Sequence, residues 1–167
     1  MSDEDAKRGS SMRLGVTGHQ VLPVVAFKPI HDAIKGLLRE AGEDLIGFSS
    51  LAAGSDQLFA HLVLEAGGQL QVVLPSWGYE ETLLDRDREE FERLLALAES
   101  HEVLPFGAPS EQAFFAAGRR VVDLCTRLVA VWDGQPSRGL GGTADVVAYA
   151  RRRARDVQVI WPEGVVR

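Results

Sequence analysis

The stretch "RLVAVWDGQPSRGLGGTADVVAYA" (residues 127–150) joins a short apolar run to an amphipathic one through a loop rich in glycine. The run Arg127–Asp133 is typical of a strand that is buried on both faces of a sheet. Small residues before a helix let the backbone approach a phosphate, because free N–H groups and the helix dipole favour an anion there. The alternative is that Gly141 and Gly142 only permit a tight turn and Thr143 caps the helix. The sequence leaves both open.

Short apolar runs alternate with amphipathic ones along the rest of the chain. The strands are predicted at 13–18, 45–50, 70–75, 101–105, 127–133 and 157–161, and the helices at 30–41, 56–66, around 91–98, at 110–125 and at 144–154. Strands that alternate with helices form parallel sheets through right-handed crossovers. The sequence therefore predicts an α/β fold, a Rossmann-like three-layer sandwich with a mainly parallel sheet.

The length of 167 residues fits one domain with its own core. We expect residues 1–12 to form a disordered tail and residues 13–167 to form the single domain. No apolar run approaches the ~20 residues that a membrane span needs, and the N-terminus is unlike a signal peptide. These features predict a soluble cytoplasmic protein without a membrane partner.

Charge and cysteine content narrow the function further. The formal net charge of -6 disfavours nucleic acid as a partner, because such binding depends on an excess of lysine and arginine. The basic cluster Arg151–Arg155 falls where the last helix should end and is explained first by the helix dipole, although a DNA-binding role is the alternative. The single cysteine, Cys125, argues against a disulfide framework or a zinc site. We expect no metal and no cofactor.

Ligands of open parallel sheets bind beyond the carboxyl ends of the strands, so the loops that follow strands contain the candidate binding residues. These candidates are Thr17, Gly18 and His19 after the first strand, Ser50, Gly54, Ser55 and Asp56 after the second, Pro75 after the third, and Asp133, Gly134, Gly141, Gly142 and Thr143 after the fifth. Because the strands are parallel, these loops should converge at one edge of the sheet.

Several of these side chains have a structural alternative. Asp56 and Asp145 lie in the first turn of a helix, where a carboxylate stabilises the dipole without any ligand. Asp133 fits ribose binding or an Asx turn equally well. Arg119 is a candidate phosphate ligand, with solvation as the alternative.

Aromatic side chains near the strand ends leave a similar choice. Trp77, Tyr79 and Trp132 are able to stack on a base or to pack in the core.

Three motifs together resemble the SLOG superfamily, the Rossmann-like group that contains the LOG proteins and the DNA-processing protein DprA/Smf. They are "GVTGH" (15–19), "SSLAAGSDQLFAH" (49–61) and "LVAVWDG...GGTADVV" (128–147). The second resembles the "SGLAxGID...AH" signature of DprA, which Ser50, Leu51, Ala52, Gly54, Asp56, Ala60 and His61 match. The third resembles the "PGGxGTxxE" signature of LOG phosphoribohydrolases at Gly141, Gly142 and Thr143. The resemblance runs from Arg13 to Trp161 and implies binding of a nucleotide or nucleotide-derived ligand, with a sensor role in many members.

The sequence departs from the LOG signature at the position of the catalytic glutamate. Val146 occupies that position, and Asp145 precedes it by one residue. Arg138 is the nearby candidate for the arginine that LOG enzymes carry before the motif. Two functions follow: binding of a nucleotide-like ligand, or a LOG-like cleavage of the N-glycosidic bond of a nucleoside monophosphate with Asp145 or Asp56 as the acting carboxylate. Whether the protein is an enzyme stays open at this point.

The resemblance also implies a homo-oligomer, because related folds pair through helices that flank the site. Phe114 and Phe115 are candidates for such an interface. The alternative is that the two phenylalanines are buried inside a single chain.

Overall fold

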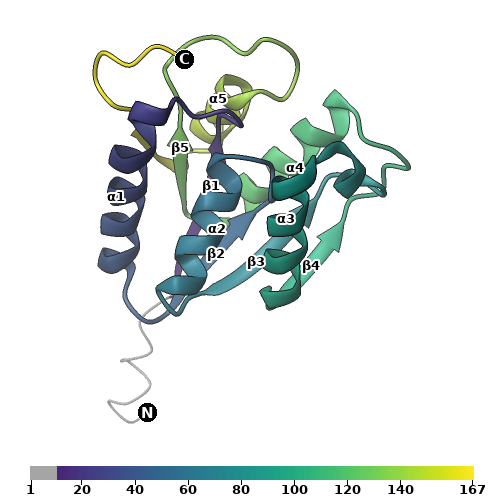
Figure 1. The fold of residues 1–167 in the computed structure, drawn as a ribbon, viewed down its shortest axis with the longest axis horizontal. Coiled ribbons are helices and arrows are strands. Elements are labelled where there is room, and N and C mark those ends of the chain that lie inside the picture. The colour runs from purple at the N-terminus through teal and green to yellow at the C-terminus, as the bar shows by residue number, and fades with distance from the viewer. Residues whose placement is uncertain (1–10) are drawn as a thin grey trace.

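A six-stranded sheet forms the centre of the protein (Figure 1). The computed structural model describes residues 11–167. The strands are β1 (Met12–Gly18), β2 (Leu45–Ser49), β3 (Gln69–Leu74), β4 (Ser100–Val103), β5 (Arg127–Val131) and β6 (Asp156–Ile160). Their order is β4-β3-β2-β1-β5-β6, and every neighbouring pair is parallel. The predicted α/β fold is confirmed.

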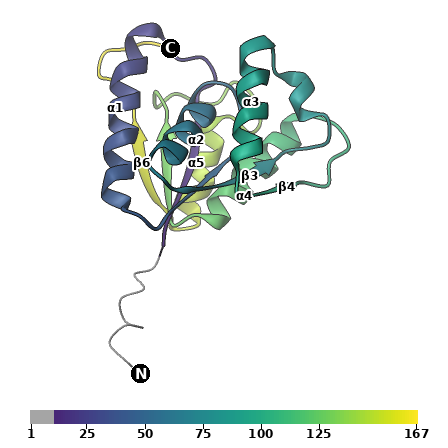
Figure 2. The same ribbon diagram turned by 60° about the horizontal axis from the view of Figure 1, so that its bottom comes forward.

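Within residues 11–167, five α-helices and the 3-10 helix η2 cover the two faces of this sheet. They are α1 (Val24–Ala41), α2 (Ser55–Glu65), η2 (Tyr79–Thr82), α3 (Asp85–Leu97), α4 (Glu111–Leu124) and α5 (Thr143–Arg152). Helices α1, α2 and α3 pack on one face and α4 and α5 on the other, as the two views in Figures 1 and 2 show. None of the helices within residues 11–167 is long and apolar enough to cross a membrane.

Most boundaries differ from those predicted by one or two residues, and the largest differences are at the starts of α1 and α3, which each begin six residues before the predicted position. Residues 1–10 of the expected tail lie outside the described residues, but Met12 belongs to β1, where its N–H donates to the Asp44 carbonyl at 3.1 Å. Helix α1 begins at Val24, six residues before the predicted start at Ile30, with Pro29 inside it. Val24 and Val25 in the added turns are exposed, and Ala26, four residues before Ile30, continues the buried face.

The first two strand-end loops pack tightly against each other at the carboxyl edge of the sheet. A Cβ at Gly18 would lie 2.6 Å from the side chain of Ser55, and a Cβ at Gly54 would lie 2.2 Å from the Gln20 carbonyl. Gly54 also has a φ of 75°, which L side chains rarely adopt. Glycine is therefore required where these loops meet, and the contact brings the start of α2 beside the end of β1.

Candidate functional site

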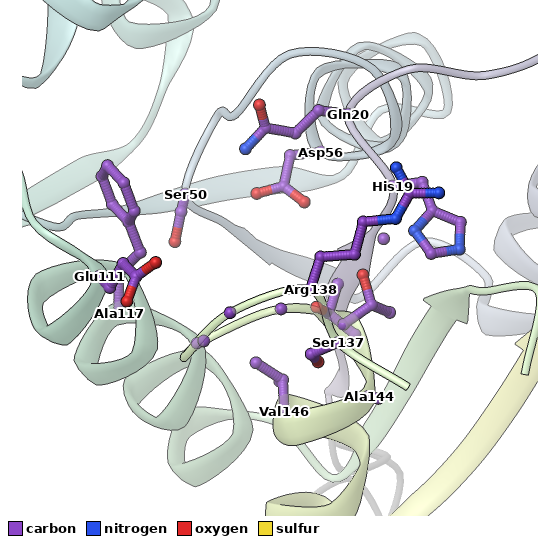
Figure 3. Close-up of a pocket in the computed structure, with 18 of the residues that line it drawn as sticks. His19, Gln20, Ser50, Asp56, Glu111, Ala117, Ser137, Arg138, Ala144 and Val146 are labelled. Carbon is purple, nitrogen blue, oxygen red and sulfur yellow. The ribbon is translucent and has the colours of Figure 1, made fainter. Parts of the chain in front are cut away.

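A cavity of about 530 Å³ lies at the carboxyl edge of the sheet, between the starts of α2 and α5 and one side of α4 (Figure 3). This volume lies within the range of small-molecule sites. Nine of the predicted binding residues line it: Thr17, Gly18, His19, Ser50, Asp56, Pro75, Gly141, Gly142 and Thr143. The structure thus brings together residues from the ends of four strands.

The other predicted binding residues, Gly54, Ser55, Asp133 and Gly134, do not line the cavity. The Ser55 hydroxyl donates to the His19 carbonyl at 2.7 Å, and so fixes the loop that carries the His19 ring. Asp133 accepts a hydrogen bond from the Gln135 N–H at 3.1 Å, which is the Asx turn that the sequence allowed as an alternative. Gly134 has a φ of 82° within this turn, and Gly54 lies in the tight loop contact described above.

His19 is held between two charged side chains at one end of the cavity. Arg167 Nη1 donates to His19 Nδ1 at 2.9 Å, and His19 Nε2 lies 3.0 Å from Asp133 Oδ1. Because a guanidinium only donates, Nδ1 accepts from Arg167, while Nε2 lies close to both the Asp133 carboxylate and the Asp133 backbone N–H, the latter at 3.1 Å. Burial, the charge of Arg167 and that of Arg138 lower the pKa of His19, against the opposing effect of Asp133.

The loop before α5 places a second set of polar groups at the cavity. The Asp145 carboxylate accepts the Gly141 N–H at 3.0 Å, and the Ser137 hydroxyl accepts the Asp145 N–H at 3.2 Å. Asp145 therefore closes the turn and does not line the cavity. Gly142, not Thr143, is the N-cap of α5, and no side-chain bond caps it.

The first amides of α5 remain available to a ligand. Within the described part of the chain, the N–H groups of Gly142, Thr143 and Ala144 donate to no protein acceptor. Free N–H groups at the positive end of a helix are an anion-binding arrangement.

Asp56 presents a buried carboxylate to the cavity, next to Gln20 in the view of Figure 3. The residue is 8% exposed, and no side chain among residues 11–167 donates to it or pairs with it. Burial raises its pKa to about 7, although the backbone amides of Ala52 and Ser50 act in the opposite direction. A carboxyl group with a pKa near 7 is able to act as a proton donor or acceptor, or as a hydrogen-bond acceptor for a ligand.

Apolar and aromatic side chains form the wall beside Asp56. Tyr79, Leu83 and Phe114 line the cavity, and the rings of Tyr79 and Phe114 meet edge to face with centroids 6.0 Å apart. Burial and the charge of Asp56 raise the pKa of Tyr79. Glu111 is the other carboxylate of the cavity, and it is exposed.

Other candidates lie elsewhere or have structural partners. The Arg119 guanidinium lies over the Phe115 ring at 4.8 Å, outside the cavity lining. Trp77 is 67% exposed and does not line the cavity. Trp132 does line it, and its indole N–H donates to the Gln135 carbonyl at 2.8 Å. Val146 also lines the cavity, so the position of the LOG glutamate is at the site but carries no acid.

The arginine cluster after α5 contacts the protein itself. Arg153 lies 3.3 Å from the Asp123 carboxylate, and Arg155 donates to the Val122 carbonyl at 3.1 Å. In the described residues, no group of three histidine, cysteine, aspartate or glutamate side chains is arranged to hold a metal ion.

Sequence reasoning missed several lining residues. Glu111 and Phe114 come from one side of α4, and Gln20 and Arg167 belong to no motif. These four residues are identified as part of the cavity only because the folded chain brings them close to the strand-end loops; their positions in the sequence do not indicate it.

The fold is that of a Rossmann-like α/β protein, and solved structures with a similar fold are those of two DprA proteins and of a molybdenum cofactor carrier protein. The chain superposes on DprA from Streptococcus pneumoniae with a TM-score of 0.69 and 20% identity, over 93% of this chain and 52% of that one. DprA from Helicobacter pylori, whose structure concerns single-stranded DNA binding, gives a TM-score of 0.63 and 13% identity over 89% and 65%. The molybdenum cofactor carrier protein of Chlamydomonas reinhardtii gives a TM-score of 0.54 and 18% sequence identity, over 90% of this chain and 76% of that one.

These similarities confirm the fold that the SLOG resemblance implied. No family model matches the chain, and no curated protein matches it. The chain spans about half the length of the pneumococcal DprA, so the activity and partners of the whole DprA protein are not carried over to it.

Proposed function

We propose that the protein binds a nucleotide or a nucleotide-derived small molecule in the strand-end cavity. In this proposal it acts as a sensor or carrier of that ligand. The observation that carries the proposal is the free α5 N-terminus next to Arg138 in a cavity of about 530 Å³. Three backbone amides and a guanidinium suit a phosphate group, whose oxygens accept several hydrogen bonds at once. The formal net charge of -6 favours a small ligand over a nucleic acid.

Calorimetric titration of the purified chain with 5′-nucleoside monophosphates tests this proposal. Arg138→Met should weaken binding about 10-fold or more, because it removes a charge-assisted hydrogen bond to the phosphate. Arg152→Met is the matched control, since Arg152 is exposed in the last turn of α5, far from the helix start. Native mass spectrometry of the gently purified protein would show a retained nucleotide directly. If no nucleotide binds at millimolar concentration, the proposal is wrong.

A second candidate function is hydrolysis of the N-glycosidic bond of a nucleoside monophosphate. The observation that favours it is the carboxyl group of Asp56, which faces the cavity with its pKa raised to about 7. Such a group is able to activate water or protonate the leaving base, and the oxocarbenium-like transition state needs a nearby carboxylate. Asp145 is less suited to this role because its carboxylate already accepts the Gly141 N–H.

Product analysis separates the two functions. Incubation with AMP and GMP should release ribose 5-phosphate and the free base if the protein is a hydrolase, and Asp56→Asn should abolish the release. Binding without any release supports the binding function alone. Release that persists in an Asp56→Asn, Asp145→Asn double variant removes both carboxylates from the mechanism.

A further inference from the structure

The two ends of the cavity have opposite chemistry. His19, Arg138 and Arg167 line one end, where both arginines are close enough to lower the pKa of His19. Asp133 offsets part of this positive charge through its contacts with His19 and with Arg167 Nε at 3.4 Å. The start of α5 belongs to the same loop as Arg138, so this end suits the phosphate of a ligand.

The other end is acidic and aromatic. Tyr79 and Phe114 form its wall, and Tyr79 packs in one buried cluster with Ala60 of α2, about one turn after Asp56, which also lines the cavity. A flat ring that packs against an aromatic and aliphatic wall gains buried area there. When the phosphate of a nucleotide occupies the cationic end, its base therefore extends toward Asp56, and its polar edge meets the carboxylate.

The Asp56 carboxylate lines the cavity, is 8% exposed and has no side-chain donor among residues 11–167. No cation pairs with it among the described residues, and only the backbone amides of Ser50 and Ala52 act on it within the protein. An ionised carboxylate accepts hydrogen bonds at two oxygens and donates none. A base whose ring edge carries a lone pair opposite this group would leave two acceptors facing each other in a buried place, which is unfavourable.

On the basis of the proposed nucleotide binding, we propose that Asp56 selects a guanine base, by accepting hydrogen bonds from the N1–H and the 2-amino group of the ring. Guanine is the common base that presents two adjacent N–H donors on one edge. Adenine and cytosine place a ring lone pair next to their amino group, and uracil places carbonyls on both sides of its single N–H. Glu111, the other carboxylate of the cavity, is exposed to solvent.

The test compares GMP, IMP and AMP by calorimetric titration of the full chain at pH 8.5, where Asp56 is ionised. IMP lacks only the 2-amino group, and AMP also replaces the N1–H by a lone pair. We expect GMP to bind about 10- to 100-fold more tightly than IMP, because a hydrogen bond to a charged group is lost, and AMP to bind more weakly still. This series needs no variant and so does not depend on how a substitution folds.

The variant Asp56→Asn provides the second arm. The asparagine amide offers one donor beside one acceptor, which matches the adenine edge and opposes that of guanine. The variant should lose about 10-fold or more in affinity for GMP and gain affinity for AMP. Asp44→Asn is the matched control, because Asp44 is exposed beside the amino end of β2, at the opposite edge of the sheet.

Each outcome decides the inference. Preference of the wild type for GMP, together with its loss in Asp56→Asn and not in Asp44→Asn, supports it. Equal affinity of the wild type for the three nucleotides overturns it while the proposed nucleotide binding stands. Preference for GMP that persists in Asp56→Asn removes Asp56 from base selection. Absence of binding of all three nucleotides overturns both the inference and the proposed function.

Discussion

Replacement of Asp56 by asparagine should change how the stability of the protein depends on pH. Burial raises the pKa of Asp56 from 3.8 to about 7 in the folded chain, so the folded state keeps a proton that the unfolded state loses between pH 4 and pH 7. Stability therefore falls as the pH rises through this window. A pKa difference of about three, at 1.36 kcal/mol for each pH unit, corresponds to about 4 kcal/mol of destabilisation above pH 7.

The size of this effect makes it measurable. A cost of about 4 kcal/mol is a large part of the 5–15 kcal/mol by which domains are stable. Asp56→Asn has no ionisable group, so it should become more stable relative to the wild type as the pH rises from 4.5 to 8. In a chain of this length, about 4 kcal/mol corresponds to a difference in Tm of about 10 °C.

Urea unfolding at pH 4.5 and pH 8, followed by tryptophan fluorescence, measures the effect. The quantity to compare is the change in the free energy of unfolding between the two pH values, because any fixed cost of the amide cancels. Asp44→Asn, a substitution at an exposed position, should keep the wild-type pH dependence. Parallel pH dependence of the wild type and Asp56→Asn would refute the assignment of a buried, uncompensated carboxylate.

The other predictions concern the loops around the cavity. Gly54→Ala should lower the free energy of unfolding by about 2–4 kcal/mol, since its φ is 75° and the new Cβ would overlap the Gln20 carbonyl. Gly36→Ala, with open space around it in α1, should instead raise it by about 0.5–1 kcal/mol in the same denaturation experiment. The lowered pKa of His19 means that the fold holds this ring neutral, so stability should fall as the pH drops below 6.5, and His19→Gln should lack this acid-side loss in urea titrations.

The sequence determined the elements of the fold and the edge at which the loops meet. Short apolar runs that alternate with amphipathic ones favour a parallel sheet, and the carboxyl ends of parallel strands lie at one edge. For this reason Thr17, Ser50, Pro75 and Thr143 were expected to share a site, and all four line the cavity. Local patterns sufficed because each of these residues lies at the end of a strand, directly follows one or begins a helix.

Only the tertiary structure decided what those residues do. Arg167 reaches His19 across 148 positions of sequence, and no local pattern encodes such a contact. Asp56 and Asp145 looked alike in the sequence, as acids in the first turn of a helix. Asp145 is paired with the Gly141 amide, whereas Asp56 is buried beside Tyr79 without a cation, and its pKa rises accordingly. The protonation of a carboxyl group depends on solvent exclusion and on its neighbours in space, and these are properties that the folded chain alone defines.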